Sequence, residues 1–223
     1  MTAYFITGAG TDVGKTFVVC GLIRALAARG RKVRALKPVA SGFDAAHPGA
    51  SDAGQLLAAM GRAVTPDEIA AICPWRFAAA LSPDMAAACE GKAIDFDAVV
   101  EFSRASKPGE TLLVEGVGGV MVPLDHRHTT LDWMAALGFP VILVSGSYLG
   151  ALSHTLSAFE VLRGRGLKVA ALVTSESPDS IVSLEETARS IAKFTEPLTP
   201  VKLPRDPAAQ GAAFKQLVDV LAG

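Results

Sequence analysis

A glycine-rich turn between a short apolar run and a longer amphipathic stretch is the feature that most constrains how this chain can fold. Residues 8–16 read GAGTDVGKT; they follow the apolar run Ala3–Thr7 and open the amphipathic stretch Lys15–Arg29. This order predicts a buried strand, a phosphate-binding loop (P-loop) and a helix, because glycines let backbone N–H groups converge on phosphate oxygens and a helix N-terminus favours anions. Lys15 is then placed to reach the β- and γ-phosphates of a nucleotide, and the Thr16 hydroxyl to bind Mg²⁺.

The turn departs from the strict P-loop pattern at one position. Ala9 stands where the first glycine belongs, five residues before Gly14, and Gly8 and Gly10 flank it. The structural alternative is a glycine-rich turn whose lysine is simply solvated. The coincidence of strand, turn, Gly-Lys-Thr and helix favours nucleotide binding over that alternative.

Apolar runs and amphipathic stretches alternate along the rest of the chain. This alternation predicts an α/β fold with a doubly wound, mostly parallel sheet and helices on both faces, of the P-loop nucleoside triphosphate hydrolase type. The expected strands are Ala3–Thr7, Val33–Pro38, Thr111–Glu115, Pro140–Ser145 and Val169–Thr174. The expected helices are Lys15–Arg29, Ser51–Met60, Pro66–Ala71, Pro83–Glu90, Phe96–Ser106, Ala151–Arg165, Leu184–Lys193 and Ala208–Leu221. The stretch Ser41–Ser82 is the least regular and is expected to hold loops and short helices.

Length and composition narrow the function classes. The 223 residues contain no internal repeat and no Pro/Ser-rich linker, so a single domain over residues 1–223 is expected. With 21 Lys and Arg against 22 Asp and Glu, the net charge is -1, and the basic excess that nucleic-acid binding requires is missing. No apolar run is long enough to span a bilayer and no signal peptide is recognisable, so a cytoplasmic protein without a membrane partner is expected.

Cysteine and histidine give no sign of a metal cage. Cys20, Cys73 and Cys89 are far apart and form no Cys-x-x-Cys pair, which argues against a disulfide framework or a zinc site. His126 and His128 lack a further ligand nearby, so a solvated loop is the better interpretation of that segment.

Three polar side chains near predicted strand ends or helix starts are candidate site residues. Lys37 closes the second predicted strand; its ammonium group could stabilise a transferring phosphoryl group or simply extend into solvent, and position alone does not decide. Glu115 closes the third strand, at the place of the Walker-B acid that holds Mg²⁺, and a P-loop in the same chain favours this role over an ordinary strand-ending acid. Asp52 is either a further cation ligand or part of a helix N-cap pair with Ser51.

Taken together, these segments resemble the ATP-dependent dethiobiotin synthetase family. The likeness rests, in order and spacing, on residues 8–16, KPVASG at 37–42, SDA at 51–53, EGVGG at 115–119, PL at 123–124 and PVILV at 140–144, and it weakens after about residue 175. A P-loop alone is widely shared, whereas the KPV segment and the EGVGG turn at these distances are far more specific. The resemblance implies a cyclo-ligase of biotin biosynthesis, which joins CO₂ to 7,8-diaminononanoate and closes a cyclic urea while ATP becomes ADP and phosphate.

The resemblance also implies roles for individual residues. Lys15 and Lys37 match the family's two active-site lysines, which serve a reaction that passes through a carbamate and a carbamic-phosphoric anhydride. Mg²⁺ is implied to be held by Thr16, Asp52 and Glu115, an all-oxygen set of the kind this cation prefers. The diamine or its carbamate is implied to contact Thr11, Lys37 and Ser41. ATP is implied to contact Asp12, Val13, Gly14, Lys15, Thr16, Phe17, Asp52, Glu115, Gly116, Val117, Gly118, Ser175, Glu176, Pro204, Arg205 and Asp206.

A homodimer follows from the same resemblance, because the family's active sites lie at a subunit interface. Gly150, Ala151 and Leu152 match the segment that receives the substrate carboxylate from the neighbouring subunit, and free N–H groups at a helix start suit an anion.

The chain departs from the family pattern in three places. Ser175 and Glu176 stand where an Asn followed by an Asp is common, Asp12 replaces a glutamate, and residues 202–206 share only Pro204 with the family. The main alternative function is a P-loop regulatory ATPase of the partitioning or metallochaperone type. Such proteins usually carry an additional lysine early in the P-loop, and residues 8–10, GAG, contain none.

Overall fold

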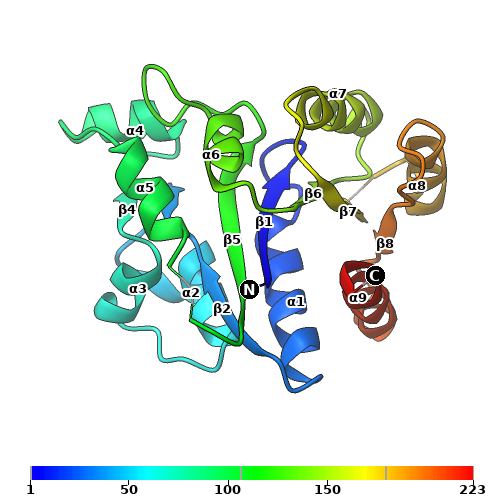
Figure 1. Ribbon diagram of the computed structural model, residues 1–223, viewed down its shortest axis with the longest axis horizontal. Coiled ribbons are helices and arrows are strands. Elements are labelled where there is room, and N and C mark those ends of the chain that lie inside the picture. The colour runs from blue at the N-terminus through cyan, green and yellow to red at the C-terminus, as the bar shows by residue number, and fades with distance from the viewer. Residues whose placement is uncertain (1, 106, 179, 223) are drawn as a thin grey trace.

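A six-stranded parallel sheet forms the centre of the protein. The computed structural model describes residues 2–105, 107–178 and 180–222. The strand order is β2-β5-β1-β6-β7-β8, and a separate two-stranded parallel sheet pairs β3 with β4 (Figure 1). The strands are β1 (Thr2–Gly8), β2 (Lys32–Leu36), β3 (Val39–Ser41), β4 (Trp75–Phe77), β5 (Glu110–Gly119), β6 (Val141–Ser145), β7 (Val169–Ser175) and β8 (Val201–Leu203).

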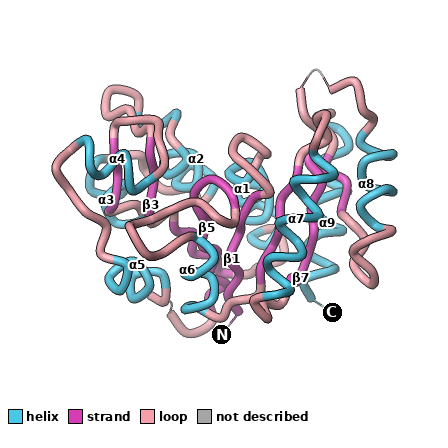
Figure 2. The backbone as a smooth tube through the Cα atoms, turned by 90° about the horizontal axis from the view of Figure 1, so that it is seen from above, coloured by secondary structure: helices cyan, strands magenta, loops and turns pink. Residues whose placement is uncertain are grey.

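Helices cover both faces of this sheet. On one face α1 (Lys15–Ala27) packs against α2 (Asp52–Ala59) and α9 (Pro207–Ala222). On the other lie α6 (Thr130–Leu137) and α7 (Ala151–Gly164) (Figure 2). The remaining helices are the 3₁₀-helix η1 (Pro48–Ala50), α3 (Pro66–Ile72), α4 (Pro83–Cys89), α5 (Phe96–Ser103) and α8 (Leu184–Ala192). The expected doubly wound α/β architecture is confirmed.

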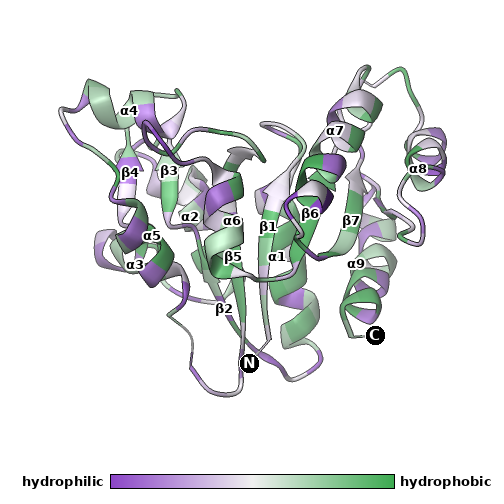
Figure 3. Ribbon diagram, turned by 45° about the horizontal axis from the view of Figure 1, so that its top comes forward, coloured by the Kyte–Doolittle hydropathy of each residue, from purple (hydrophilic) through white to green (hydrophobic). Residues whose placement is uncertain are grey.

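The central strands form the core because both of their faces are covered. Every residue of β6 is buried, as are residues 111–117 of β5, and Figure 3 shows these strands mostly in the green of apolar residues. Near-continuous apolar runs of this kind suit strands enclosed between two helical layers. Across β1 and α6, the rings of Phe5 and Trp133 meet edge to face at a centroid distance of 4.8 Å.

Strand register brings the predicted polar residues to one edge of the sheet. Leu36 of β2 pairs with Val114 of β5, and Ile6 of β1 pairs with Glu115 of β5. Lys37, the residue after Leu36, therefore lies beside Glu115, and the P-loop follows β1 at the same edge. Ligands of open parallel sheets bind at the carboxyl ends of the strands.

Helix α6 and the three short strands β3, β4 and β8 were not expected from the sequence. Helix α6 escapes periodicity analysis because Thr130, Leu131, Trp133, Met134 and Leu137 are all buried, so it has little polar face to reveal it. Strand β8 is only three residues long.

Several expected boundaries also shift. The irregular stretch 41–82 holds β4 as well as the expected short helices. Helix α5 ends at Ser103, before the expected end at Ser106, which lies outside the described residues. Helix α1 ends at Ala27, two residues before the expected end at Arg29. Among the helices described, none has the length and apolar character needed to cross a membrane.

Candidate active site

The P-loop owes its shape to residues in the left-handed backbone region. Gly14 caps the N-terminus of α1 with φ 93°, and Asp12 has φ 57°. A Cβ atom at Gly8 would lie 2.6 Å from the carbonyl oxygen of Gly10, so only glycine fits there. Ala9 needs no such freedom, because its N–H donates to the carbonyl of Val144 in β6 at 2.8 Å and thereby continues the strand pairing. The departure from the strict pattern therefore has a structural explanation.

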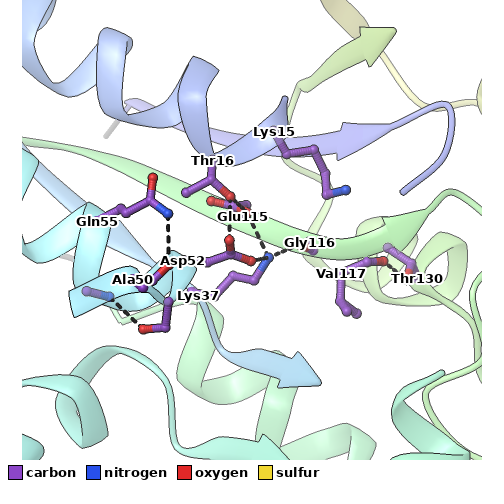
Figure 4. Close-up of polar contacts among 12 residues, drawn as sticks. Lys15, Thr16, Lys37, Ala50, Asp52, Gln55, Glu115, Gly116, Val117 and Thr130 are labelled. Carbon is purple, nitrogen blue, oxygen red and sulfur yellow. Dashed lines mark hydrogen bonds and ion pairs between the residues drawn. The ribbon is translucent and has the colours of Figure 1, made fainter. Parts of the chain in front are cut away.

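Three oxygen-bearing side chains converge beside the P-loop (Figure 4). The Thr16 hydroxyl lies 2.8 Å from Asp52 Oδ1 and 2.8 Å from Glu115 Oε1. Thr16 is in the first turn of α1, Asp52 opens α2 and Glu115 lies in β5, so three separate elements supply the cluster. Ser51 is also the N-cap of α2, since its hydroxyl accepts from Gly54 N. Asp52 is thus free to turn its carboxylate toward the P-loop while Ser51 does the capping.

Lys37 lies at the centre of this cluster. Its Nζ donates to Glu115 Oε1 at 2.7 Å and lies 2.8 Å from Asp52 Oδ2. A third contact, at 2.9 Å, reaches the carbonyl oxygen of Gly116. Lys37 is 2% exposed and Glu115 is fully buried. A lysine that simply extends into solvent is therefore excluded.

Burial and mutual attraction set the protonation of these groups. Burial alone would lower the pKa of Lys37, but the charges and hydrogen bonds of Glu115 and Asp52 outweigh it and raise that pKa. Burial is the main cause that raises the pKa of Glu115, against the opposing charge of Lys37. Partial burial is also the largest single influence on Asp52 and would raise its pKa, but the charge of Lys37 and the hydrogen bonds from Lys37 and Thr16 together outweigh it and lower that pKa. The Lys37 ammonium group is accordingly a permanent charge in this site.

Lys15 has a different environment. Its Nζ lies 3.3 Å from the carbonyl oxygen of Gly10, and no contact joins it to the carboxylates in Figure 4. Burial, followed by the nearby charge of Lys37, lowers the pKa of Lys15 to about 8. The Lys15 ammonium group therefore lacks a strong anionic partner of its own and is available for one.

The oxygen cluster fits a hard divalent cation. Two carboxylates and one hydroxyl are the donor types that Mg²⁺ prefers, with water and phosphate completing its shell. In the described part of the chain Glu115 Oε2 is buried and has no hydrogen-bond partner, which leaves an acceptor open within the cluster. No group of three or more His, Cys, Asp or Glu side chains is placed to hold a metal among the residues described. Thr16, Asp52 and Glu115 offer fewer donors than the octahedral shell of Mg²⁺ requires, so a cation here would also need oxygens from water or a ligand.

A cavity of about 910 Å³ opens in front of the cluster. Thr11, Ser41 and Lys37 line it, which brings all three predicted substrate contacts of this subunit into one space. Apolar residues, among them Ala80, Leu81, Pro83 and Val122, form part of its wall. The residues that line this cavity and were not predicted are Ala40, Gly42, Gln55, Ala80, Leu81, Ser82, Pro83, Val122 and Pro123.

A smaller cavity of about 290 Å³ lies on the other side of the P-loop. Asp12, Gly14 and Phe17 border both cavities, so one elongated ligand could cross the loop from one to the other. The predicted residues Val13, Ser175, Glu176, Pro204 and Arg205 line the smaller cavity. Glu176 Oε2 accepts from Arg205 N at 2.7 Å and so joins the two loops that form its wall.

Sequence reasoning missed three residues of this smaller cavity. Ser177 and Pro178 follow the end of β7, and the general rule for carboxyl-end loops could have found them. Gln210 comes from α9, and no local sequence signal marks it.

The remaining predicted site residues are divided between the larger cavity and positions outside both cavities. Gly116 contributes its carbonyl oxygen to Lys37, and Asp206 is exposed beside the smaller cavity's loop. Val117 and Gly118 line the larger cavity. Gly150, Ala151 and Leu152 open α7 and line neither cavity. Leu149, next to them, is 79% exposed.

Comparison with known proteins identifies close relatives by sequence. A family model described as an AAA domain, AAA_26, matches residues 2–211. The ATP-dependent dethiobiotin synthetase BioD of Acidiphilium cryptum (strain JF-5) is 52% identical, over 86% of this chain and 88% of the relative. The protein of the same name from Methylobacterium nodulans is 50% identical, over 86% and 89%. That of Phenylobacterium zucineum (strain HLK1) is 54% identical, over 80% and 78%.

Solved structures with a similar fold are more distant in sequence. The septum site-determining protein MinD of Pyrococcus horikoshii, in complex with Mg-ADP, has a TM-score of 0.58 at 17% identity and covers 100% of this chain and 97% of its own. The hydrogenase maturation factor HypB of Archaeoglobus fulgidus has a TM-score of 0.57 at 14% identity and covers 100% and 89%. At these identities the likeness supports the P-loop fold alone.

Proposed function

The chain belongs to the ATP-dependent dethiobiotin synthetase family, and from this premise we propose how its site performs the family's reaction. The protein is an ATP-dependent cyclo-ligase of biotin biosynthesis that converts 7,8-diaminononanoate and CO₂ to the cyclic urea dethiobiotin. ATP is its co-substrate, and its substrates are small molecules. We propose roles for individual residues, a Mg²⁺ site and a homodimer. We also propose that residues 1–223 form a single domain.

The main support for this function is the position of Lys37. It is buried beside Thr16, Asp52 and Glu115, and it lines a cavity that the P-loop borders. The reaction needs a nucleoside triphosphate, a cation and a small diamine with an apolar alkyl chain in one place. The larger cavity combines a P-loop, an oxygen cluster and a partly apolar wall, and it has the volume of a small-molecule site.

In the proposed mechanism one substrate amine takes up CO₂ as a carbamate in the larger cavity, beside Thr11 and Ser41. A carbamate oxygen then attacks the γ-phosphate of ATP, and ADP leaves. The second amine attacks the carbamate carbon of the resulting anhydride, phosphate departs and the ring closes. Phosphoryl transfer of this kind depends on positioning and charge neutralisation more than on covalent help.

The two lysines supply the fixed positive charge. Lys37 faces the reacting carbamate and γ-phosphate, and burial makes its charge more effective than a solvated one. Lys15 binds the β- and γ-phosphates, which would provide the anionic partner that it lacks here. Thr16, Asp52 and Glu115 would hold Mg²⁺, which when bound neutralises phosphate charge as a Lewis acid.

The nucleotide is proposed to extend across the P-loop, with its base in the smaller cavity. Residues 12–17 and 115–118 contact its phosphates, and Ser175, Glu176, Pro204 and Arg205 surround the base. Asp206 belongs to the same loop. The apolar faces of Val13, Phe17 and Pro178 support stacking of a planar ring.

We further propose a homodimer, in which Gly150, Ala151 and Leu152 receive the substrate carboxylate of the neighbouring subunit. Ala151 N donates to the Tyr148 carbonyl at 2.9 Å, so the next N–H groups in the first turn of α7 would bind that anion. Leu149 and Leu152 would be covered by the partner. The proposed place of action is the cytoplasm, where the three cysteines, which form no disulfide within the described residues, stay reduced.

The experiment that tests the function measures ADP release with each component omitted in turn. The proposal predicts that release requires both the diamine and bicarbonate. The rival, a regulatory P-loop ATPase, predicts release that depends on neither. The MinD and HypB likenesses do not favour this rival, because they concern the fold alone.

A further inference from the structure

The ammonium group of Lys37 has the environment that a bound cation would have. Its Nζ lies within 2.9 Å of three oxygens, from Glu115, Asp52 and the Gly116 carbonyl. An ammonium group has three donors, so all of them are used. Figure 4 shows these contacts meeting at one point between the two carboxylates.

We propose that Lys37 occupies the cation site of the nucleotide-free protein, so that a divalent cation alone must compete with it for Asp52 and Glu115. This inference rests on the proposed function, because it takes these two carboxylates as the cation ligands. It assigns to Lys37 a second role, which precedes its role in the reaction.

Electrostatics explains why the competition is strong. The two carboxylates carry two negative charges, and Lys37 neutralises one of them. Lys37 and Glu115 are both buried, so little water screens that pair, whereas the Asp52 side chain is 41% exposed and its attraction to Lys37 is more strongly screened. A cation that entered with Lys37 in place would meet its charge at close range. A cation that displaced Lys37 would break contacts between charged groups, each worth about tenfold or more in an equilibrium constant.

A nucleotide removes this obstacle. Lys37 lines the larger cavity, which the P-loop borders, so the phosphates of a bound nucleotide would give its ammonium group new anionic partners. Asp52 and Glu115 would then be free for the cation. Divalent cation and nucleotide are therefore expected to enter together, so that the buried Glu115 carboxylate never remains without a positive charge beside it.

The test uses Mn²⁺ alone as the probe, with the free ion counted by electron paramagnetic resonance in the absence of nucleotide. Lys37→Met removes the ammonium group and keeps an unbranched side chain. The matched control is Lys15→Met, which removes one positive charge near the same carboxylates but from a side chain bonded to the Gly10 carbonyl. We expect Lys37→Met to bind Mn²⁺ at least about tenfold more tightly than the wild type, and clearly more tightly than Lys15→Met. Equal affinity of the two variants, or of Lys37→Met and the wild type, would overturn the proposal.

A second measurement needs no change at Lys37. The thermal midpoint of the wild type is measured with MgCl₂, with ADP and with both, and Glu115→Gln reports any effect of Mg²⁺ that arises elsewhere. A ligand raises the midpoint only if it binds the folded state. With ADP present, we expect MgCl₂ to raise the midpoint of the wild type more than it raises the midpoint of Glu115→Gln. Without ADP, we expect MgCl₂ to shift both midpoints by the same amount. A larger rise in the wild type with MgCl₂ alone would show that Lys37 does not compete.

These readouts are independent of the reaction. A protein that makes dethiobiotin but binds Mn²⁺ equally well with and without Lys37 would refute this inference and leave the function intact. If the wild type makes no dethiobiotin but Lys37→Met binds Mn²⁺ more tightly than the wild type, the proposed function is refuted and this inference stands.

Discussion

Lys37 Nζ lies 2.7 Å from Glu115 Oε1, although 78 residues separate the two in the chain. One follows β2 and the other lies in β5, and the register of these neighbouring strands brings them together. The contact joins the element that would handle the transferring phosphoryl group to the element that would hold the cation. The catalytic account depends on this pair more than on any other.

Lys37→Gln should leave the fold intact and reduce turnover by about 10²–10³, which is the scale for loss of one preorganised charge contact. The matched control is Lys202→Gln, which removes an exposed lysine paired with Glu185. The measurement is the steady-state rate of ADP release, together with circular dichroism to check the fold. Near-normal turnover in Lys37→Gln would show that the lysine serves only to neutralise Glu115.

Glu115→Gln should shift the dependence of the rate on Mg²⁺ to higher concentration, because the substitution keeps the shape of the side chain and removes a charged ligand. The rate is measured across a Mg²⁺ titration at fixed ATP. A half-saturating Mg²⁺ concentration equal to that of the wild type would remove Glu115 from the cation site.

Gly14→Val should abolish tight nucleotide binding. Gly14 has φ 93°, and a Cβ atom there would lie 3.1 Å from the Ser175 hydroxyl, between the P-loop and the smaller cavity. The control is Gly61→Val, at φ 71° with no atom within 4 Å of the added Cβ, which carries similar backbone strain away from the site. Calorimetric titration with ADP compares the two, and unchanged affinity in Gly14→Val would contradict the proposed phosphate cradle.

Asp132→Asn should lower the free energy of unfolding at pH 7 by about 1 kcal/mol, the usual loss for a helix N-terminal cap. The Asp132 carboxylate accepts from Thr129 N and Oγ1 at the start of α6 and from Arg165. Partial burial would raise the pKa of Asp132, but these hydrogen bonds and the Arg165 charge lower it overall.

The sign of the pH dependence follows from that lowered pKa. The stabilisation is complete above the ordinary pKa of an aspartate, about 3.9, and is lost as the pH falls through the lower folded-state value. The difference between wild type and Asp132→Asn, measured by urea unfolding, should therefore close below about pH 4. A difference that stays constant from pH 7 to pH 3 would mean that the charge of Asp132 contributes nothing.

Leu152→Asp should convert the proposed dimer to monomers and lower activity with it. Leu152 lies in the first turn of α7 and is 40% exposed, so a partner subunit would have to desolvate the new charge. Phe194→Asp places a charge on an exposed aromatic residue at the end of α8 and serves as the control. Light scattering after size exclusion gives the mass; a Leu152→Asp protein that remains dimeric would place the interface elsewhere.

Local sequence patterns were sufficient for much of the fold, and they singled out most residues of the candidate site. A glycine-rich turn with Gly-Lys-Thr between a strand and a helix predicted the P-loop, because those features lie within about ten residues of one another. Glu115 and Lys37 were candidates because polar residues that end buried strands stand out against their neighbours, but for Lys37 position left a solvated lysine equally open, and only the family resemblance favoured a catalytic role. The contact between Glu115 and Lys37 could not be predicted from local sequence, because it depends on β2 and β5 being neighbours in the sheet.

The elements that escaped prediction are those shaped by tertiary packing. Helix α6 is buried on nearly all sides, so its apolar residues show no clear period. Its capping box, Thr129 with Asp132, was nevertheless a readable signal. Gln210 reaches the smaller cavity only because α9 packs beside β7 and β8, a contact between distant parts of the chain.

The most direct test of the central claim follows the carbon atom. The protein is incubated with ¹³C-bicarbonate, 7,8-diaminononanoate, ATP and Mg²⁺, and the products are quantified by mass spectrometry and ADP assay. The account predicts one dethiobiotin labelled at the urea carbon for each ADP formed. ADP formation without a labelled cyclic urea would contradict it.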